Sequence, residues 1–251
     1  MTRSNNKIAL VTGAGNENSI GTAICRKLAS QGIDIFFTCY KSNVDWIERF
    51  QNELINSGVR SAGLEIDFSQ SDAHLQLLDT VSQKLGFPTI LINSAAHSID
   101  ANYLELDAKL LDDHYAINVR ATCLLSVEFA RRFEQFKESS GRIIHLTSGQ
   151  GLGPMPGNLA YVASKGAITA FSQSLSAELA HLGITVNAVN PGPTDSNWMT
   201  DEIRRDLLPK FPMGRIGLPE DAARTVAFLA SEDASWITGQ VIHSEGGFSR
   251  G

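Results

Sequence analysis

The chain has few cysteines, and they form no cluster. Its 251 residues include three, Cys25, Cys39 and Cys123, with no C-x-x-C pair among them. An odd number of widely spaced cysteines favours neither a disulfide framework nor a zinc site. We expect three small buried apolar side chains and no metal site.

Long apolar runs and a basic excess are also missing. No stretch of about 20 apolar residues is present, which predicts no membrane-spanning helix, and the polar segment 1–7 shows no signal peptide. The chain has 21 Lys and Arg against 27 Asp and Glu, a net charge of −6. Nucleic-acid binding by phosphate neutralisation is therefore disfavoured. These absences predict a cytoplasmic protein that binds neither membranes nor nucleic acid.

Apolar β-rich runs alternate with amphipathic helical windows along the chain. The predicted strands are residues 7–12, 33–39, 62–67, 89–93, 142–147, 184–189 and 240–243. The predicted helical windows are residues 19–30, 45–56, 72–85, 106–137, 160–182 and 219–230. This alternation predicts an α/β fold, a Rossmann-type doubly wound parallel sheet with helices on both faces. No linker divides it, so residues 1–251 are expected to form a single dinucleotide-binding oxidoreductase domain.

Two segments rich in Gly and Pro, residues 149–158 and 192–217, each follow a predicted strand. Ligands of open α/β sheets bind beyond the carboxyl ends of the strands. Both segments are therefore expected to form walls of the site, and Met155 and Trp198 within them could contact substrate or pack against a neighbouring loop or subunit.

A glycine-rich turn joins the first predicted strand to the first helix. Glycines there let the backbone approach a pyrophosphate, and the helix N-terminus offers free N–H groups. Gly13 would form the tight turn, and Gly21 would let the helix pack on the strand. The spacing departs from G-x-G-x-x-G, because Ser19 stands where a middle glycine is expected, followed by Ile20. Ser19 could cap the helix and bind a phosphate; the alternative is an ordinary long loop.

The segment after the second strand bears on which dinucleotide binds. An acid there would bind the ribose 2′-hydroxyl of NAD, but the sequence reads Tyr40-Lys41-Ser42. Lys41 and Ser42 could instead meet a 2′-phosphate. NADP(H) is thus favoured, and NAD(H) is the alternative. For Lys41 the alternative is an ordinary solvent-exposed side chain.

Tyr161 and Lys165 lie four residues apart on a predicted helix, and therefore on one face. A nearby ammonium lowers the pKa of a phenol, which suits the tyrosine to proton transfer near pH 7. Ser148 follows a predicted strand beside the same cleft and could hold a substrate carbonyl oxygen. Taken alone, the Tyr–Lys pair could equally be a surface pair.

Further motifs accompany this pair. They are Ile117-Asn118-Val119, Asn93-Ser94-Ala95-Ala96, Asp67-Phe68, Asn190-Pro191-Gly192-Pro193-Thr194, and Thr238-Gly239-Gln240 with Gly246-Gly247. Together with the spacing of Ser148, Tyr161 and Lys165, they resemble the short-chain dehydrogenase/reductase family over residues 7–247. Within that family the resemblance leans toward 3-oxoacyl-carrier-protein reductases.

The resemblance implies roles for these residues. Tyr161 would protonate the carbonyl oxygen, Lys165 would bind the nicotinamide ribose and lower the Tyr161 pKa, Ser148 would stabilise the developing alkoxide, and Asn118 would hold a water molecule. The implied cofactor-binding residues are Gly13, Ser19, Ile20, Gly21, Tyr40, Lys41, Ser42, Asp67, Phe68, Asn93, Ala95, Tyr161, Lys165, Pro191, Gly192 and Thr194. The family also implies a homotetramer built through the helices that carry Asn118 and Tyr161.

The expected function is an NADP(H)-dependent oxidoreductase that interconverts a ketone and a secondary alcohol, with a small-molecule or acyl-thioester carbonyl substrate. The glycine loop is two residues longer than is usual in the family. In this it resembles the loop of enoyl-thioester reductases, which are the alternative enzyme. That branch usually separates its Tyr and Lys by six positions and lacks the Ser, so Ser148 and the close pair favour carbonyl chemistry. A non-catalytic NADP(H)-sensing protein is an alternative of another class.

Two histidines are not assigned to the chemistry. His97 follows the Asn93-Ser94-Ala95-Ala96 motif and is expected to be a loop residue, with a place in the cleft as the alternative. His114, next to Asp112 and Asp113, is expected at a solvated helix start rather than at a metal.

Overall fold

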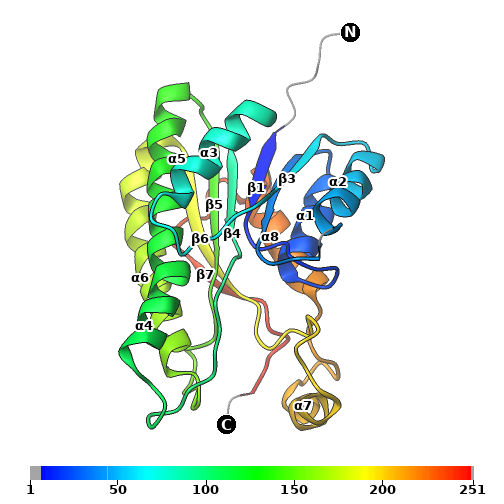
Figure 1. Cartoon of the computed structure of the whole chain (residues 1–251), viewed down its shortest axis with the longest axis vertical. Helices are drawn as coiled ribbons and strands as arrows, with labels where there is room; N and C mark the ends of the chain where they lie inside the picture. Colours follow the sequence, from blue (N-terminus) through cyan, green and yellow to red (C-terminus); the bar gives the residue numbers. More distant parts are fainter. Residues whose placement is uncertain (1–6, 44, 250–251) are drawn as a thin grey trace.

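The computed structural model describes residues 7–43 and 45–249 of the chain. Segment 1–6, which makes up most of the polar segment predicted to hold no signal peptide, lies outside the described residues. The described part forms one seven-stranded sheet in the order β3-β2-β1-β4-β5-β6-β7, and every neighbouring pair is parallel. Figure 1 shows helices on both sides of this sheet. The predicted doubly wound parallel sheet is confirmed.

The strands are short and largely buried. In sheet order they are β3 (Ser61–Glu65), β2 (Asp34–Cys39), β1 (Ile8–Val11), β4 (Ile90–Asn93), β5 (Gly141–Leu146), β6 (Ile184–Asn190) and β7 (Val241–His243). Their near-continuous apolar runs are typical of parallel strands covered on both faces. Side chains alternate between the faces, so Phe36 and Phe37 of β2 contribute to two different apolar cores.

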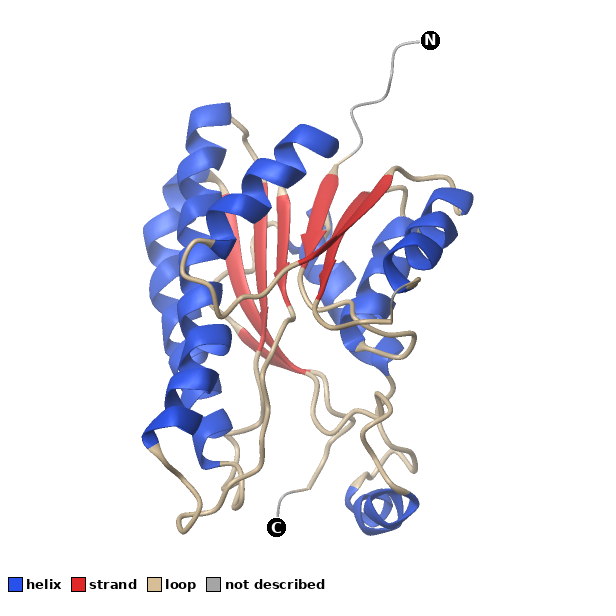
Figure 2. Cartoon of the chain, viewed as in Figure 1, coloured by secondary structure: helices blue, strands red, loops and turns tan. Residues whose placement is uncertain are grey.

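Each core is closed by its own set of helices. On one face lie α1 (Ile20–Ala29), α2 (Trp46–Asn56) and α8 (Pro219–Ala230), with Leu28, Phe50 and Val226 buried against the sheet. On the other lie α3 (Ala73–Lys84), α5 (Thr122–Phe136) and α6 (Leu159–Leu179), which bury Leu77 and Phe129. Loops connect the strands to these helices at both ends of the sheet (Figure 2).

The structure refines one predicted segment and corrects another. The window 106–137 is helical as predicted, but its helix consists of α4 (Ala108–His114), a π-helical segment Tyr115–Ala121 and α5. Segment 192–217, expected to be irregular, contains α7 (Asp201–Leu207), which Thr200 caps by accepting a hydrogen bond from the Ile203 N–H at 3.2 Å. The other predicted bounds agree to within two residues once the 3-10 turn Ala180–Leu182 is counted with α6.

Three of the expected absences concern this fold. No helix in the described part of the chain is both long and apolar enough to cross a membrane. All three cysteines are free, and Cys25 and Cys39 are buried whereas Cys123 is partly exposed. Within residues 7–43 and 45–249, no three His, Cys, Asp or Glu side chains are grouped so that they could hold a metal ion.

Candidate active site

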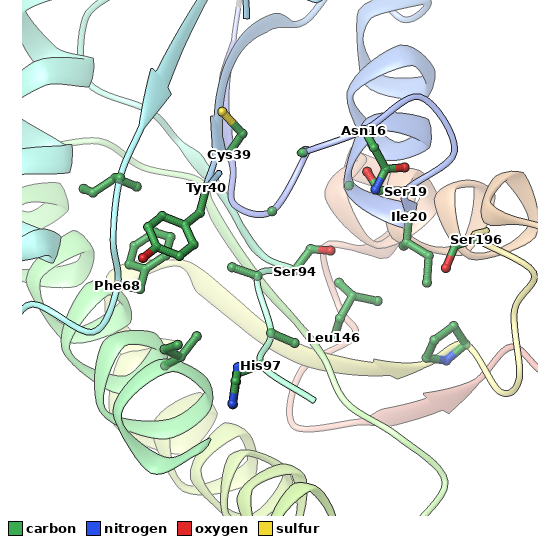
Figure 3. Close-up of a pocket in the computed structure, with 18 of the residues that line it drawn as sticks. Asn16, Ser19, Ile20, Cys39, Tyr40, Phe68, Ser94, His97, Leu146 and Ser196 are labelled. Carbon is green, nitrogen blue, oxygen red and sulfur yellow. The ribbon is translucent and has the colours of Figure 1, made fainter. Parts of the chain in front are cut away.

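A cavity of about 430 Å³ lies at the carboxyl ends of the central strands. The predicted site residues that line it are Gly13, Ser19, Ile20, Gly21, Tyr40, Asp67, Phe68, Ala95, Tyr161, Lys165 and Pro191. In Figure 3, Tyr40 and Phe68 lie on one side and Ile20 and Ser196 on the other, with the segment from Ser94 to His97 between them. The glycine loop and the Tyr–Lys pair thus share one cavity.

Some predicted site residues do not line this cavity, and several lining residues were not among the predicted ones. The predicted residues outside the lining are Lys41, Ser42, Asn93, Asn118, Ser148, Gly192 and Thr194. The added lining residues are Gly15, Asn16, Cys39, Ile66, Ser94, Ala96, His97, Ile117, Leu146, Thr147 and Ser196. Most of the added residues flank a predicted one, so sequence proximity was the available signal.

Close backbone packing explains two of the glycines. Gly13 has a φ of +81°, and a Cβ atom there would lie 2.7 Å from the backbone of Ala95. A Cβ atom on Gly21 would lie 2.4 Å from the Gly13 carbonyl oxygen. Ser19 caps α1 as expected, because its Oγ accepts a hydrogen bond from the Thr22 N–H at 3.1 Å. The N-terminus of α1 therefore opens onto the cavity.

The longer glycine loop is fastened on two sides. Thr22 Oγ1 donates to the Asn16 carbonyl oxygen at 2.7 Å, and Arg26 donates to the Glu17 carbonyl oxygen at 3.0 Å. On the other side, Asn18 Nδ2 donates to Oδ1 of Asn197, at 3.0 Å, in the segment after β6. The loop thus joins α1 to the segment that follows β6, next to the cavity-lining residues Asn16 and Ser196.

At the end of β2 and β3, the side chains of Tyr40 and Asp67 meet. Tyr40 donates a hydrogen bond from its hydroxyl to Asp67 Oδ2 at 3.3 Å, and Asp67 Oδ1 accepts one from the Ser69 N–H at 2.8 Å. Partial burial opposes ionisation, but hydrogen bonds from Ser69 hold the Asp67 pKa below its usual range. Asp67 therefore presents an ionised carboxylate at this end of the cavity.

Lys41 and Ser42 differ from expectation. Ser42 Oγ donates to the Gly15 carbonyl oxygen at 2.8 Å, so it holds the glycine loop and does not line the cavity. Lys41 has a φ of 49°, and its backbone N–H donates to Glu65 Oε1 at 3.0 Å. Its ammonium lies 5.0 Å from the centre of the Tyr40 ring, and Tyr40 does line the cavity. The lysine charge is therefore beside the cavity rather than in its wall.

Tyr161 and Lys165 share a face of α6, with Nζ of Lys165 5.6 Å from the centre of the Tyr161 ring. Lys165 is 4% exposed, and Nζ donates to the Leu146 carbonyl oxygen at 2.7 Å. Burial lowers the pKa of Lys165 to about 8. Burial also raises the pKa of Tyr161, although a hydrogen bond with Ser148 lowers it in part. In the protein alone the Tyr161 pKa is therefore shifted in the opposite direction to the predicted one, because desolvation of the phenol outweighs its hydrogen bond with Ser148.

Ser148 Oγ lies 3.8 Å from the sulfur of Met155 as well as interacting with Tyr161. Met155 therefore packs on the serine in the segment after β5.

Asn118 connects the loop after β4 to the turn of α6 that carries Tyr161. Its amide nitrogen donates to the His97 carbonyl oxygen at 2.8 Å and to Ser164 Oγ at 2.9 Å, and its oxygen accepts from the His97 N–H at 2.7 Å. Ser164 Oγ donates in turn to the Tyr161 carbonyl oxygen at 2.7 Å. The π-helical segment places Asn118 for these contacts. Its water-holding role stays a prediction.

Asn93 belongs to a buried polar network behind the cavity. Its amide nitrogen donates to Ser126 Oγ at 3.2 Å, and the ring of His145 lies between Ser126 and Ser172, at 3.0 and 2.7 Å. Burial, and then the Lys165 charge, lower the His145 pKa to about 3, so this histidine is neutral. Asn93 therefore links β4 to α5 and does not line the cavity, although it was predicted to bind cofactor.

The segment after β6 is held by close packing and by hydrogen bonds to its backbone carbonyl groups. Gly192 has a φ of +64°, and a Cβ atom there would lie 2.5 Å from Cβ of Glu245. Thr194 donates to the Gly192 carbonyl oxygen at 3.2 Å, and the Trp198 indole donates to the Thr194 carbonyl oxygen at 2.7 Å. Of the three predicted residues in this segment, only Pro191 lines the cavity.

The cavity has the features that a dinucleotide needs. Gly13, Gly15 and Gly21 of the glycine loop line it, and without side chains their backbone can approach a pyrophosphate. Thr147 Oγ1 lines it and is buried with no hydrogen-bond partner. Lys165 Nζ has three N–H groups and makes one hydrogen bond, to Leu146. The residues present therefore fit a nicotinamide dinucleotide.

Comparisons with known proteins agree with this geometry. Residues 13–249 match the family model described as Enoyl-(Acyl carrier protein) reductase. The chain is 65% identical, over all 251 residues of both chains, to the uncharacterized oxidoreductase YjdA of Bacillus subtilis. It is 34% identical over 247 residues to the 3-oxoacyl-acyl-carrier-protein reductase FabG of Staphylococcus epidermidis, covering 96% of this chain and 98% of that one.

Solved structures give the same result. A short-chain dehydrogenase/reductase from Serratia marcescens superposes with a TM-score of 0.88 at 31% identity, covering 97% of this chain and 98% of that one. Acetoin dehydrogenase YohF from Salmonella typhimurium superposes with a TM-score of 0.87 at 30% identity, covering 97% and 96%.

Proposed function

Because this chain belongs to the short-chain dehydrogenase/reductase family of oxidoreductases, we propose that it interconverts a ketone and a secondary alcohol with NADP(H), with a 3-oxoacyl thioester as the model substrate. One observation carries this proposal. Tyr161 and Lys165 line the same cavity as the glycine loop, and Ser148 interacts with the Tyr161 phenol. A proton donor, a cation and a phosphate-binding turn therefore surround one space.

The chain's residues supply the proton and the orientation. The bound reduced nicotinamide supplies the hydride to the carbonyl carbon. Tyr161 donates its phenolic proton to the carbonyl oxygen, so that one hydride and one proton convert the ketone into the alcohol. Ser148 donates a hydrogen bond to the same oxygen and stabilises its developing charge. Lys165 binds the ribose and stabilises the phenolate that remains, while Asn118 holds a water molecule from which the phenol regains its proton.

Other parts of the cavity support the preference for NADP(H). Neither Lys41 nor Ser42, which follow β2, is an acid, and the Lys41 ammonium lies over the ring of Tyr40 in the cavity wall. A lysine in this place can pair with a 2′-phosphate as a point charge. The ionised carboxylate of Asp67 is suited to bind the adenine amino group.

Lys41→Ala is expected to raise KM for NADPH about tenfold and to change KM for NADH less than twofold. The reason is the loss of one charge-assisted hydrogen bond to the 2′-phosphate, about 1.5 kcal/mol. Steady-state kinetics with both dinucleotides measure this. Lys7→Ala, which removes a lysine paired with Glu232, is the control. An equal loss for both dinucleotides would remove Lys41 from the 2′-phosphate site.

Enoyl-thioester reduction is the second candidate, because the matching family model carries that description and the glycine loop is long. The purified protein, NADPH and a matched pair of 3-oxoacyl and 2-enoyl thioesters separate the two. We expect oxidation of NADPH with the 3-oxoacyl thioester alone. Oxidation with the enoyl thioester alone would establish the second candidate. Binding of NADPH with no turnover on either thioester or on a panel of ketones would favour a non-catalytic NADP(H)-sensing protein.

We also propose a cytoplasmic homotetramer formed through the helices that carry Asn118 and Tyr161. Apolar side chains are exposed there: Tyr115 is 59% and Leu111 40% exposed. Ala163, Ala167 and Ala170 form an exposed stripe on α6 that allows close helix packing. Sedimentation equilibrium tests this, and a single 27.2-kDa species would contradict it.

A further inference from the structure

The side chain of His97 lines the cavity without a hydrogen bond. Neither ring nitrogen has a partner among the residues that the structure describes, and Nε2 is buried. The ring lies at the end of the segment that begins at Ser94 (Figure 3). We propose that His97 binds a second oxygen atom of the substrate, near the reacting carbonyl, so that the site prefers oxygen-bearing ketones to simple ones. This rests on the proposed carbonyl reduction.

The backbone of His97 is held by hydrogen bonds that lead to the helix of Tyr161. Both its N–H and its carbonyl oxygen bond the side chain of Asn118, at 2.7 and 2.8 Å. Asn118 also bonds Ser164, which bonds the carbonyl oxygen of Tyr161. Three successive hydrogen bonds thus connect His97 to the turn of α6 that carries the phenol. A side chain on a backbone held in this way can select substrates, because the segment that carries it does not have to be ordered when the substrate binds.

His114 packs against the His97 ring but does not supply it with a hydrogen-bond partner. The two rings are 4.6 Å apart, at an interplanar angle of 64°. His114 is 1% exposed, so its predicted place at a solvated helix start is wrong. Its Nδ1 donates to the Leu110 carbonyl oxygen at 2.8 Å, and its Nε2 accepts from the Ile99 N–H at 3.2 Å. With both nitrogens used, His114 leaves His97 free to bond a ligand.

An unsatisfied buried polar atom in a folded protein calls for an explanation. Its desolvation cost is uncompensated until a partner arrives. Burial, and then the neighbouring His114, lower the His97 pKa, so the ring is neutral at pH 7. A neutral imidazole carries one N–H donor and one acceptor nitrogen. It can therefore donate to a carbonyl oxygen or bond a hydroxyl group.

The rest of the cavity indicates a neutral ligand. Its charged wall residues are Asp67 and Lys165, and both are assigned above to the dinucleotide. The neighbours of His97 in the wall include Ala96 and Ile117, which offer no side-chain hydrogen bond. A hydroxyl, ester or thioester oxygen meets a partner here, whereas a carboxylate meets no cation other than Lys165.

Two pairs of ketones with nearly equal shape test the proposal, each with NADPH. The first pair is 1-hydroxybutan-2-one and pentan-3-one, and the second is methyl 3-oxobutanoate and 4-methylhexan-2-one. We expect the wild type to prefer the oxygen-bearing member of at least one pair by tenfold or more in kcat/KM. His97→Leu should reduce that preference to within about threefold, and His97→Asn or His97→Gln should restore part of it.

The control is His114→Gln, which removes the ring packed against His97 but keeps the His97 imidazole itself. It should change kcat/KM for both members of a pair alike. Preferences that are the same in wild type and His97→Leu, or changes in His114→Gln as large as those in His97→Leu, would overturn the assignment while leaving carbonyl reduction intact. If the wild type reduces the 3-oxoacyl thioester but none of the four ketones, the assignment of His97 is overturned alone. Failure with the thioester as well would overturn both proposals.

Discussion

Tyr161→Phe is expected to lower kcat for ketone reduction by about 10²–10⁴-fold, the contribution of a positioned general acid. The phenyl ring keeps the packing of Tyr161 on α6 but cannot supply the proton to the carbonyl oxygen. Dissociation of NADPH, measured by its fluorescence, should change less than about threefold. Stopped-flow measurement of NADPH oxidation would show the loss in the first turnover, and so separate it from slow product release.

Tyr103→Phe is the matched control for this variant. Tyr103 is 80% exposed and does not line the cavity, so its kcat should equal that of the wild type. Ser148→Ala should keep the proton donor but lose a hydrogen bond to the carbonyl oxygen, with an intermediate loss of kcat. A Tyr161→Phe protein with more than a tenth of wild-type kcat would exclude the phenol as the acid.

Lys165→Met is expected to make the protein less active and more stable. The loss of the ammonium should lower kcat by about 100-fold or more, as for other groups that stabilise developing charge. The stability gain follows from burial, which lowers the Lys165 pKa from 10.5 to about 8. Charging this lysine in the folded protein therefore costs about 3 kcal/mol. The lost hydrogen bond to Leu146 offsets about 1 kcal/mol of the gain.

The pH dependence of this stability has a definite sign. Below pH 8 both folded and unfolded Lys165 are protonated, so the folded wild type bears the full cost. Between about pH 8 and 10.5 the unfolded state holds a proton that the folded state has lost, so the wild-type free energy of unfolding rises with pH. The Lys165→Met protein lacks this pH-dependent contribution to the free energy of unfolding. Its advantage should be about 2 kcal/mol at pH 7 and should shrink as the pH approaches 10.

Urea unfolding at pH 7 and pH 9.5 measures the difference. Lys84→Met, which replaces an exposed lysine in the last turn of α3, corrects for the general effect of removing a charge. If Lys165→Met were less stable than wild type at pH 7, the cost of burying the ammonium would be smaller than the contacts it makes, and the low pKa of Lys165 would be wrong.

Local patterns predicted the parts of the site that depend on neighbours in sequence. The Gly13 to Gly21 turn, the Ser19 cap and the Tyr161–Lys165 spacing are all set within one strand, loop or helix. The parallel sheet with helices on both faces followed from the alternation of elements. These predictions hold because backbone conformation and helical periodicity act over a few residues.

Other properties depend on contacts between distant segments. The pKa of Tyr161 is governed by burial, which a sequence does not display. Ser42 bonds the glycine loop, Asn93 bonds α5, and the polar segment around His114 folds inward because Ile99 and Leu110 supply its partners. The π-helical segment at Asn118 is likewise held by His97 and Ser164, from other elements.

The same holds for the long glycine loop. Its extra length was visible in the sequence, but the bond from Asn18 to Asn197 joins residues 179 positions apart. Only the fold brings these two segments to the same side of the cavity.

The central claim is that the Tyr161 phenol becomes a proton donor of suitable acidity beside the bound dinucleotide. Ultraviolet difference titration of wild type against Tyr161→Phe reports the ionisation of this one phenol among the four tyrosines. We predict that it ionises above its ordinary range in the protein alone. With NADP⁺ bound, it should ionise at a pH lower by about one unit or more, because the oxidised nicotinamide ring is cationic. An identical titration with and without NADP⁺ would contradict the claim.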